Sequence, residues 1–490
     1  MAKPHPFFLL LCFVLAAATA TASALSPPLT HAYQELLKLK VASSRAILHK
    51  ATPNTDEEKA AALLFGNYND FWELCLEQDQ QRYSSLLEAQ EQRLAILEKS
   101  KGRSAWADFA AAEISLHIGM SELLFGNKLA AAWDLRKAYL RYRTNLQRWP
   151  GFIPNRKNLG MLQVMIGSVP DQYQWFLSIV GLKGSVREGM ANLQSAADTP
   201  TLFQDEAKLL RAVVLHALVP EKAPLAVTQL TEMVQARPDN LLFLFAAMHL
   251  LKKTNQGEAA IMLYERRPVG KQYSPFPFLH HMVADLYLYR GDYAASAAEN
   301  NRFLQQHRGK HYLKSAHYKL YLAYLLSRNP SAAKQHLKQI AEAGIRETEE
   351  DRYAARYAEE NAQPVLPLLK ARLHADGGYY DQALQDLKQP LSPSDTSLAV
   401  RAEYLYRKAR VYHGLKDLQE AVSLYRQTIV LASATELYFA PNAALQLGYI
   451  YQQADQPEVA KAYFRQALRY KGHPYKNSID AKAKLALSSF

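Results

Sequence analysis

The stretch Leu447-Gly448-Tyr449-Ile450-Tyr451 is followed at fixed distances by Ala460 and Phe464. Gly448 lies twelve residues before Ala460, and an aromatic residue follows Gly448 after three positions and Ala460 after four. Residues three or four apart lie on one face of an α-helix, so each small residue shares a face with its aromatic neighbour. Small residues let two helix backbones approach closely, and the rings fill the space beside them. The stretch therefore predicts two antiparallel helices that interlock at Gly448 and Ala460.

The same pattern recurs towards the N-terminus, with the spacing of the tetratricopeptide repeat, a helix pair of about 34 residues. The clearest further units are Ala409, Tyr412, Ala421 and Tyr425, and Ala371, His374, Ala383 and Leu387. Weaker units are Tyr321, Tyr324, Ala333 and Leu337; Ala284, Tyr287 and Ser296; Ala247, Leu250, Ala259 and Leu263; and Val214, Ala217, Ala226 and Leu230. Consecutive units begin 33, 37, 37, 50, 38 and 39 residues apart. We interpret the 50-residue step as an additional helix within residues 341–363, and an earlier unit is predicted around Gly119 and Ala131.

These units predict an all-α protein, a superhelical solenoid of antiparallel helix pairs. No stretch alternates apolar and polar residues with the period of two that a half-buried strand requires. We expect three regions: a signal peptide over residues 1–24, an N-terminal helical region over 25–200, and the repeat solenoid over 201–490.

The N-terminus has the composition of an export signal. Lys3 supplies a positive charge, residues 7–18 form an apolar core, and Ala22-Ser23-Ala24 is a small-residue cleavage site. We therefore expect an exported protein, periplasmic or envelope-associated in a bacterium and otherwise in the secretory pathway. After cleavage only Cys75 is left of the two cysteines, so no intramolecular disulfide is expected.

Residues 159–182 depart from the repeat pattern because Asp171 is the only charged residue between Leu159 and Leu182. Pro170-Asp171 interrupts the apolar run, which favours two short helices joined by a turn over one membrane-spanning helix. A buried apolar hairpin is the simpler interpretation. The alternative is membrane contact through Trp175 and Phe176.

This segment also carries a resemblance to a narrower family. Ser168-Val169-Pro170 followed by Gly181, Gly184 and Gly189, with the later run Asp376-Gly377-Gly378-Tyr379-Tyr380, resembles the eukaryotic tetratricopeptide family of the inclusion body clearance protein and tetratricopeptide repeat protein 39. The match extends over roughly residues 105–490. It implies a helical-repeat fold and an adaptor-like or lipid-homeostasis role. The chain departs from that family at Ser185-Val186, where an acidic residue and Arg are usual.

The charge does not indicate a specific anionic partner. The formal net charge is +12, but acidic stretches interrupt the basic ones, and no nucleic-acid motif accompanies them. We therefore expect no nucleic-acid partner. Basic residues gather at Arg136, Lys137, Arg141, Arg143 and Arg148.

No catalytic or cofactor-binding motif is found, so we expect a non-enzymatic protein without cofactor or metal. His281 and Asp285 share a helix face, but two residues are only half of a metal site. His374 occupies a packing position of its repeat. The acidic residues Glu347, Glu349, Glu350 and Asp351 are interpreted as a solvated helix face.

The first helices of successive repeats line the concave surface of such solenoids, which suits an extended peptide. The predicted partner-binding residues on these helices are Arg372, Glu403, Tyr406, Arg410, His413, Asn442, Tyr449 and Gln452. Arg and Tyr suit a carboxylate ligand. The sequence thus predicts an exported scaffold that binds a protein or peptide partner in its groove. The alternative is a peripheral membrane or lipid-binding protein that uses the apolar 159–182 hairpin.

Overall fold

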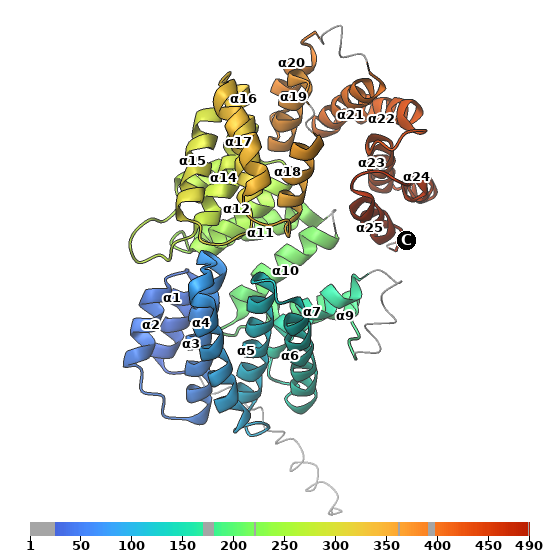
Figure 1. The fold of residues 1–490 in the computed structure, drawn as a ribbon. Helices are drawn as coiled ribbons and strands as arrows, with labels where there is room; N and C mark the ends of the chain where they lie inside the picture. Colours follow the sequence, from blue (N-terminus) through green and yellow to red (C-terminus); the bar gives the residue numbers. More distant parts are fainter. Residues whose placement is uncertain (1–24, 170–180, 220–221, 361–362, 391–396, 489) are drawn as a thin grey trace, which may run out of the picture. The chain divides into compact units, whose positions relative to one another are not determined.

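The computed structural model describes residues 25–169, 181–219, 222–360, 363–390, 397–488 and 490, and every regular element in them is an α-helix (Figure 1). The expected signal peptide and the second half of the apolar hairpin, residues 170–180, lie outside the described residues. The helices are α1 (Pro27–Leu37), α2 (Val41–Lys50), α3 (Asp56–Glu77), α4 (Gln80–Glu98), α5 (Ala105–Leu124), α6 (Lys128–Arg148), α7 (Asn155–Gly167), α9 (Val186–Asp198), α10 (Gln204–Leu218), α11 (Ala223–Ala236), α12 (Leu241–Lys253), α13 (Gly257–Glu265), α14 (Pro277–Arg290), α15 (Tyr293–Gln306), α16 (Leu313–Leu326), α17 (Pro330–Glu342), α18 (Glu349–Glu360), α19 (Leu366–Gly377), α20 (Tyr380–Leu387), α21 (Leu398–Gly414), α22 (Leu418–Ala432), α23 (Phe439–Gln453), α24 (Pro457–Arg469) and α25 (Lys476–Leu487). The protein is therefore an all-helical repeat protein, as predicted.

The chain forms two compact units, which we describe separately. Of the described residues, unit 1 comprises 25–72, 84–169 and 181–211, and unit 2 comprises 73–83 and those from 212 onwards. No helix within the described residues combines the length and the apolarity needed to cross a bilayer.

In unit 1, two helix pairs meet at glycines. A Cβ atom on Gly119 of α5 would lie 2.9 Å from the backbone nitrogen of Leu135 on α6, which confirms the early repeat unit. In the next pair, α7 and α9, a Cβ on Gly160 would lie 2.7 Å from the carbonyl oxygen of Gly189. The first half of the predicted apolar hairpin is thus a helix whose partner is α9, beyond Leu182. The Ser185 hydroxyl caps α9 by accepting a hydrogen bond from the backbone N–H of Glu188.

The centre of unit 1 is polar. The Lys157 side chain is fully buried, and its ammonium lies 2.6 Å from Glu113 and 3.0 Å from Glu206. Tyr68 donates to Glu113, and Tyr33 donates to Glu206 at 2.8 Å. Burial opposes charge on Lys157 and Glu113, but the two carboxylates raise the pKa of Lys157, and Lys157 in turn lowers the pKa of Glu113. These opposed charges hold helices α3, α5, α7 and α10 together in the core.

In unit 2, helix pairs occupy the predicted repeats from residue 241 to residue 469, and α18 is the additional helix predicted within 341–363. Two of the turns contain the glycines expected to end the first helices, Gly291 and Gly378, with φ of 90° and 85°. The turns after α16 and α21 instead use Arg328 and Lys416, with φ of 60° and 68°. Only such left-handed backbone, which glycine adopts at little cost, closes these turns tightly.

Two of the weaker units are corrected by the structure. In the α12–α13 pair Ala259 is exposed, whereas Ala260 and Tyr264 are buried. The interlocking residues there lie one position later than predicted. In the unit that begins at Val214, Ala217 is exposed, so it does not fill the predicted packing position.

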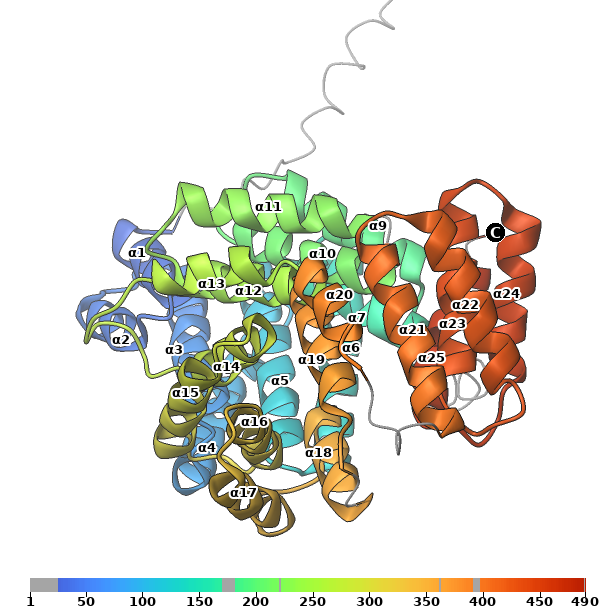
Figure 2. The same ribbon diagram turned by 90° about the horizontal axis from the view of Figure 1, so that it is seen from above.

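Helix α19 contacts helices that lie several repeats earlier in the sequence. The amide of Asn255, in the α12–α13 turn, donates to the backbone carbonyls of Ala375 and Asp376 at 3.1 and 2.8 Å, across 120 and 121 residues. A Cβ on Gly257 would lie 2.7 Å from the carbonyl oxygen of Gly377. Figure 2 shows α19 beside α14, against which it packs. Unit 2 is thus curled so tightly between α12 and α19 that non-neighbouring repeats touch.

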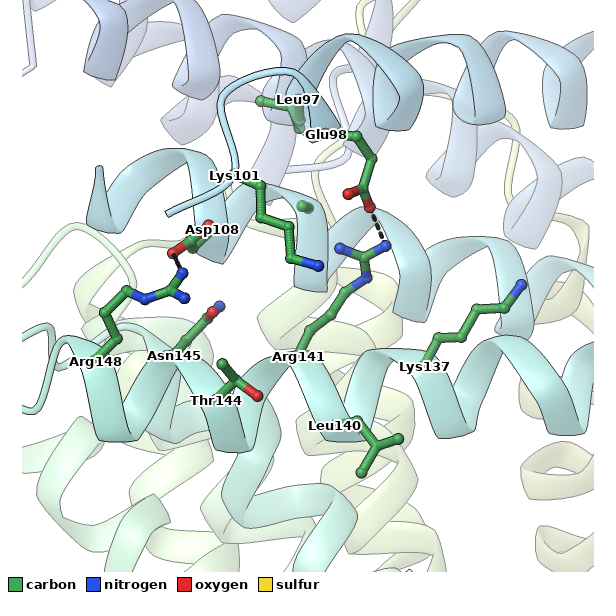
Figure 3. Close-up of a pocket in the computed structure, with 11 residues that line it drawn as sticks. Leu97, Glu98, Lys101, Asp108, Lys137, Leu140, Arg141, Thr144, Asn145 and Arg148 are labelled. Carbon is green, nitrogen blue, oxygen red and sulfur yellow. Dashed lines mark hydrogen bonds and ion pairs between the residues drawn. The ribbon is translucent and has the colours of Figure 1, made fainter. Parts of the chain in front are cut away.

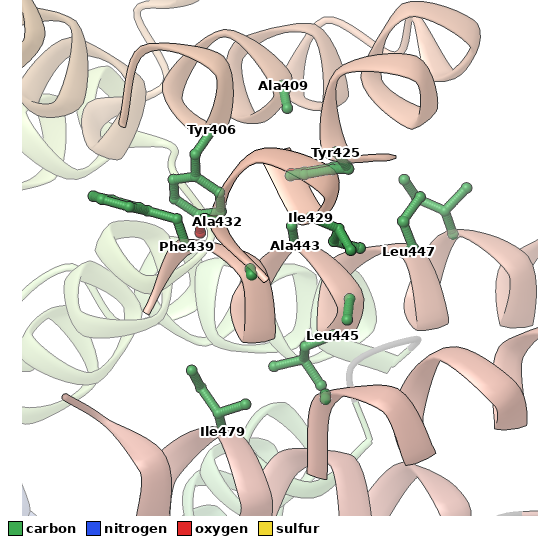
Figure 4. Close-up of a cluster of buried hydrophobic side chains, with 14 of the residues drawn as sticks. Tyr406, Ala409, Tyr425, Ile429, Ala432, Phe439, Ala443, Leu445, Leu447 and Ile479 are labelled. Carbon is green, nitrogen blue, oxygen red and sulfur yellow. The ribbon is translucent and has the colours of Figure 1, made fainter. Parts of the chain in front are cut away.

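The C-terminal repeats share one apolar core, which extends over α21 to α25 (Figure 4). Tyr406 of α21 packs against Phe439 of α23, with ring centroids 5.5 Å apart. Ala460 and Phe464 are fully buried. A Cβ on Gly448 would lie 2.4 Å from the Phe464 ring, which explains why a glycine stands there.

We predict that Gly448→Ala destabilises unit 2 by about 1–3 kcal/mol, because the added methyl group overlaps the buried Phe464 ring. Gly66→Ala on α3 is the control, since its nearest neighbour would be the flexible Arg93 side chain at 3.4 Å. This control should gain about 0.5–1 kcal/mol from helix propensity. Calorimetric unfolding measures both variants, and equal changes would contradict the close approach.

We also predict that acid destabilises unit 1 through His117. Burial lowers the pKa of this histidine to about 3, and its ring stacks on Phe71 at 4.3 Å. Because the folded-state pKa lies below the unfolded value of about 6.5, the stability is fully present above pH 6.5 and is lost as the pH falls towards 3. Between pH 7 and 5.5 the loss from this group is about 1.3 kcal/mol.

Denaturant unfolding at several pH values tests this. His117→Phe keeps the stacking and should flatten the dependence of the unfolding free energy on pH between 5.5 and 7. His49→Phe, at an exposed position of α2, is the control and should leave it unchanged. The hypothesis fails if His117→Phe and wild type have the same slope.

Candidate partner-binding surface

The eight predicted partner-binding residues lie on three first helices of unit 2: Arg372 on α19; Glu403, Tyr406, Arg410 and His413 on α21; and Asn442, Tyr449 and Gln452 on α23. Seven of them are half-buried. Tyr406 is only 1% exposed because its ring is part of the apolar core between α21 and α23. The prediction that Tyr406 is exposed to a partner is therefore wrong.

Arginines on α19 and α21 are held by tyrosine hydroxyls. Arg372 donates to the hydroxyls of Tyr353 and Tyr318 at 2.9 and 3.3 Å. Arg407, which the sequence did not single out, donates to Glu403 at 2.9 Å and to the Tyr438 hydroxyl at 3.0 Å. Burial alone would lower the pKa of Arg372, but the tyrosines raise it well above its usual value. Both guanidinium groups stay charged and are fixed in position.

Arg410 is more exposed than Arg407, and its ion pair is longer than the 2.9 Å pair of Arg407 with Glu403. Its side chain is 32% exposed, and its guanidinium lies 4.0 Å from the carboxylate of Asp376. The adjacent His413 contacts the Tyr425 hydroxyl at 3.3 Å, and burial, reinforced by Arg410 and Lys416, lowers its pKa to about 4. His413 is therefore neutral at pH 7, and the positive charge of this surface comes from Arg372, Arg407 and Arg410.

A groove with a volume of about 630 Å³ lies between α22 and α23. Leu418, Val422 and Ile450 form its apolar lining. Arg426 crosses it and donates to the hydroxyls of Tyr451 and Tyr463 at 2.8 and 3.2 Å. None of the eight predicted residues lines this groove. The sequence could have indicated this groove through Leu418 and Val422, because apolar residues four positions apart share one face of α22.

His281 and Asp285 are arranged around a lysine. The Lys319 ammonium lies 2.7 Å from Nε2 of His281 and 2.9 Å from the carboxylate of Asp285. Lys252 also pairs with Asp285. The position between the histidine and the carboxylate is thus filled by an ammonium group. Within the described ranges no group of His, Cys, Asp and Glu side chains could hold a metal ion.

The acidic residues from Glu347 into the first turn of α18 are only partly a solvated face, which corrects the prediction. Glu350 contacts His281 at 3.3 Å. Asp351 is fully buried and accepts hydrogen bonds from the backbone N–H groups of Tyr312 and Ser315, at 2.6 and 3.0 Å. It thereby satisfies N–H groups at the start of α16, which have no partner within their own helix.

His374 has the structural role predicted from its repeat position. Its Nδ1 lies 2.6 Å from the carboxylate of Asp386 and joins α19 to α20.

Comparison with known proteins identifies the repeats at the C-terminus. The tetratricopeptide repeat family matches residues 402–432 and 441–473, which contain the two units anchored at Ala409 and Gly448. No curated protein matches the sequence. The resemblance to the family of the inclusion body clearance protein therefore stays a prediction.

Similar solved structures include the human IFIT1 dimer with m7Gppp-AAAA, at 12% identity over 91% of this chain and 95% of that chain, with a TM-score of 0.37. Another is the APC/C hetero-tetramer Cut9-Hcn1, at 12% identity over 95% and 96% of the two chains, with a TM-score of 0.23.

We predict that Asp285→Ala lowers the unfolding free energy by about 3–5 kcal/mol, because it leaves Lys252 and Lys319 buried without their shared carboxylate. Asp292→Ala is the control. Its side chain is 45% exposed and pairs with Arg290 at the surface, so its cost should stay below about 1 kcal/mol. Urea unfolding compares the two variants, and similar costs would rule out a structural role for the buried ion pairs.

Proposed function

We propose that the protein is a non-enzymatic scaffold whose C-terminal repeats bind an acidic peptide segment of a partner protein. The observation that carries this proposal is the exposure of Arg410 and the length of its ion pair with Asp376. Its guanidinium is partly exposed and lies 4.0 Å from Asp376, at the outer limit of an ion pair. A carboxylate from a partner can approach more closely and accept two hydrogen bonds from one guanidinium.

The neighbouring residues support this assignment. Arg372 and Arg407 are fixed by tyrosines and add positive charge, while Glu403 is already paired with Arg407. Asn442, Tyr449 and Gln452 on the next first helix would supply polar and aromatic contacts. We propose no nucleic-acid partner, because no nucleic-acid-binding motif accompanies the basic residues of the sequence.

A binding experiment tests the role of Arg410. The probe is a fluorescein-labelled peptide of four aspartates with a free C-terminal carboxylate, and fluorescence anisotropy measures its affinity. Arg410→Ala should weaken binding about tenfold, since a charge-assisted hydrogen bond is lost. Unchanged affinity in Arg410→Ala would overturn the proposal.

The matched control is Arg426→Ala in the groove between α22 and α23, which should bind the peptide as wild type does. A loss confined to Arg426→Ala would move the site to that groove. Tyr406 is not a useful test position because it lies in the core and its removal would destabilise the repeat.

We also propose that the protein is exported, on the basis of residues 1–24. N-terminal sequencing of the protein recovered outside the cytoplasm should begin at Leu25. Recovery of the chain with Met1 intact would contradict this assignment.

A membrane-associated function is the second candidate, and an exposed apolar cluster in unit 1 favours it. Leu123 of α5 and Leu129 and Trp133 of α6 are 51%, 82% and 59% exposed. Lys128 and Arg136 lie on the same helix as Trp133 and suit anionic headgroups. Flotation with anionic vesicles tests this candidate. Trp133→Ser should release the protein if the cluster inserts, and wild type that does not float would exclude it.

A further inference from the structure

A small pocket in unit 1 is lined by basic side chains from two directions (Figure 3). It encloses about 270 Å³ between the end of α4, the start of α5 and the inner face of α6. Lys137, Arg141 and Arg148 come from α6, and Lys101 reaches towards them from the α4–α5 connection. These residues include three of the five basic residues that the sequence grouped on α6 without assigning them a ligand.

The pocket has an excess of positive charge. Four basic side chains line it, against the two carboxylates of Glu98 and Asp108. Glu98 pairs with Arg141. Asp108 accepts hydrogen bonds from the Arg148 guanidinium at 3.0 Å, the Trp149 indole at 2.9 Å and the Gly102 backbone at 2.8 Å. Lys137 pairs with Asp134, which lies outside the lining, at 2.7 Å. Arg141 and Arg148 pair with the two carboxylates of the lining, so the positive charge of Lys101 is the one that no carboxylate of the described residues balances.

Two buried donors in the lining have no acceptor among the described residues. Nδ2 of Asn145 and Nε of Arg141 make no hydrogen bond there, and Asn145 is only 5% exposed. A buried donor without an acceptor costs about 1–3 kcal/mol. Both residues line the pocket, so these unsatisfied donors lie beside the space that a ligand would occupy.

The connection that carries Lys101 is held in place by the same residues. Gly102 has a φ of 75°, and a Cβ there would lie 2.9 Å from the Arg148 guanidinium. Its backbone N–H donates to Asp108. The turn is therefore fixed against Arg148, and Lys101 is held over the pocket before any ligand binds.

We propose that this pocket binds a phosphate group. Donors approach it from α6 and from the α4–α5 connection, and a tetrahedral phosphate presents oxygens in several directions, whereas a carboxylate presents two in one plane. A phosphate monoester also carries close to two negative charges at pH 7, which would pair with Lys101 and attract the neighbouring guanidinium groups of Arg141 and Arg148. The volume suits the phosphate and a small part of the molecule that bears it.

Calorimetric titration of the full chain with inorganic phosphate at low ionic strength tests the site. Lys101→Ala should weaken binding about tenfold. Lys99→Ala, an exposed lysine two residues away that does not line the pocket, should change it less than twofold. Asn145→Ala should also weaken binding. If that buried substitution unfolds unit 1, Lys101→Ala still decides the question.

Two further ligands identify the source of the phosphate. Glycerol 3-phosphate represents a soluble ester, and phosphatidic acid in neutral-lipid vesicles represents a lipid headgroup. A response to either ligand that is lost in Lys101→Ala and kept in Lys99→Ala supports the site. No response to any of the three ligands, or equal responses from the two lysine variants, overturns the proposal.

Discussion

The close approach of paired helices at small residues is the constraint on which the structure depends. Gly448 faces the Phe464 ring, Gly119 faces the backbone of Leu135, and Gly160 and Gly189 face each other. Each contact sets the distance and direction of one helix pair. The pairs then determine which faces are left for neighbouring repeats, so the positions of Arg372 and Arg410 follow from contacts elsewhere in the repeats.

Much of the fold could be predicted from the sequence because this contact leaves a local signature. The positions around Ala409 and Gly448 each match a pair of helices, and the 50-residue step contains α18. The predicted register is wrong by one residue at Ala259, because the buried, interlocking residue is Ala260. Adjacent alanines satisfy the same spacing, and only packing distinguishes them. The return of α19 to Asn255 leaves no periodic signal, because it joins residues 120 positions apart.

The candidate surface was predicted less well, for a related reason. The repeat spacing assigns Arg372 and Arg410 to first helices, but their hydrogen bonds and their exposure depend on residues from other helices. Tyr318 and Tyr353, which fix Arg372, come from α16 and α18. Tyr406 satisfies the spacing of an exposed position and is buried because Phe439 of α23 packs against it. In the same way, the phosphate pocket is assembled from α4, α5 and α6.

The contact between Asn255 and the end of α19 also affects how the array can fold and evolve. An open solenoid behaves as a one-dimensional chain in which each repeat depends only on its neighbours, so folding can start anywhere and repeats can be gained or lost. The bonds to Ala375 and Asp376 raise the contact order of residues 241–387. We therefore expect that segment to fold more cooperatively than an open array. Deletion of the α16–α17 pair would shorten the chain between Asn255 and α19 and would also remove Tyr318, which holds Arg372 of α19.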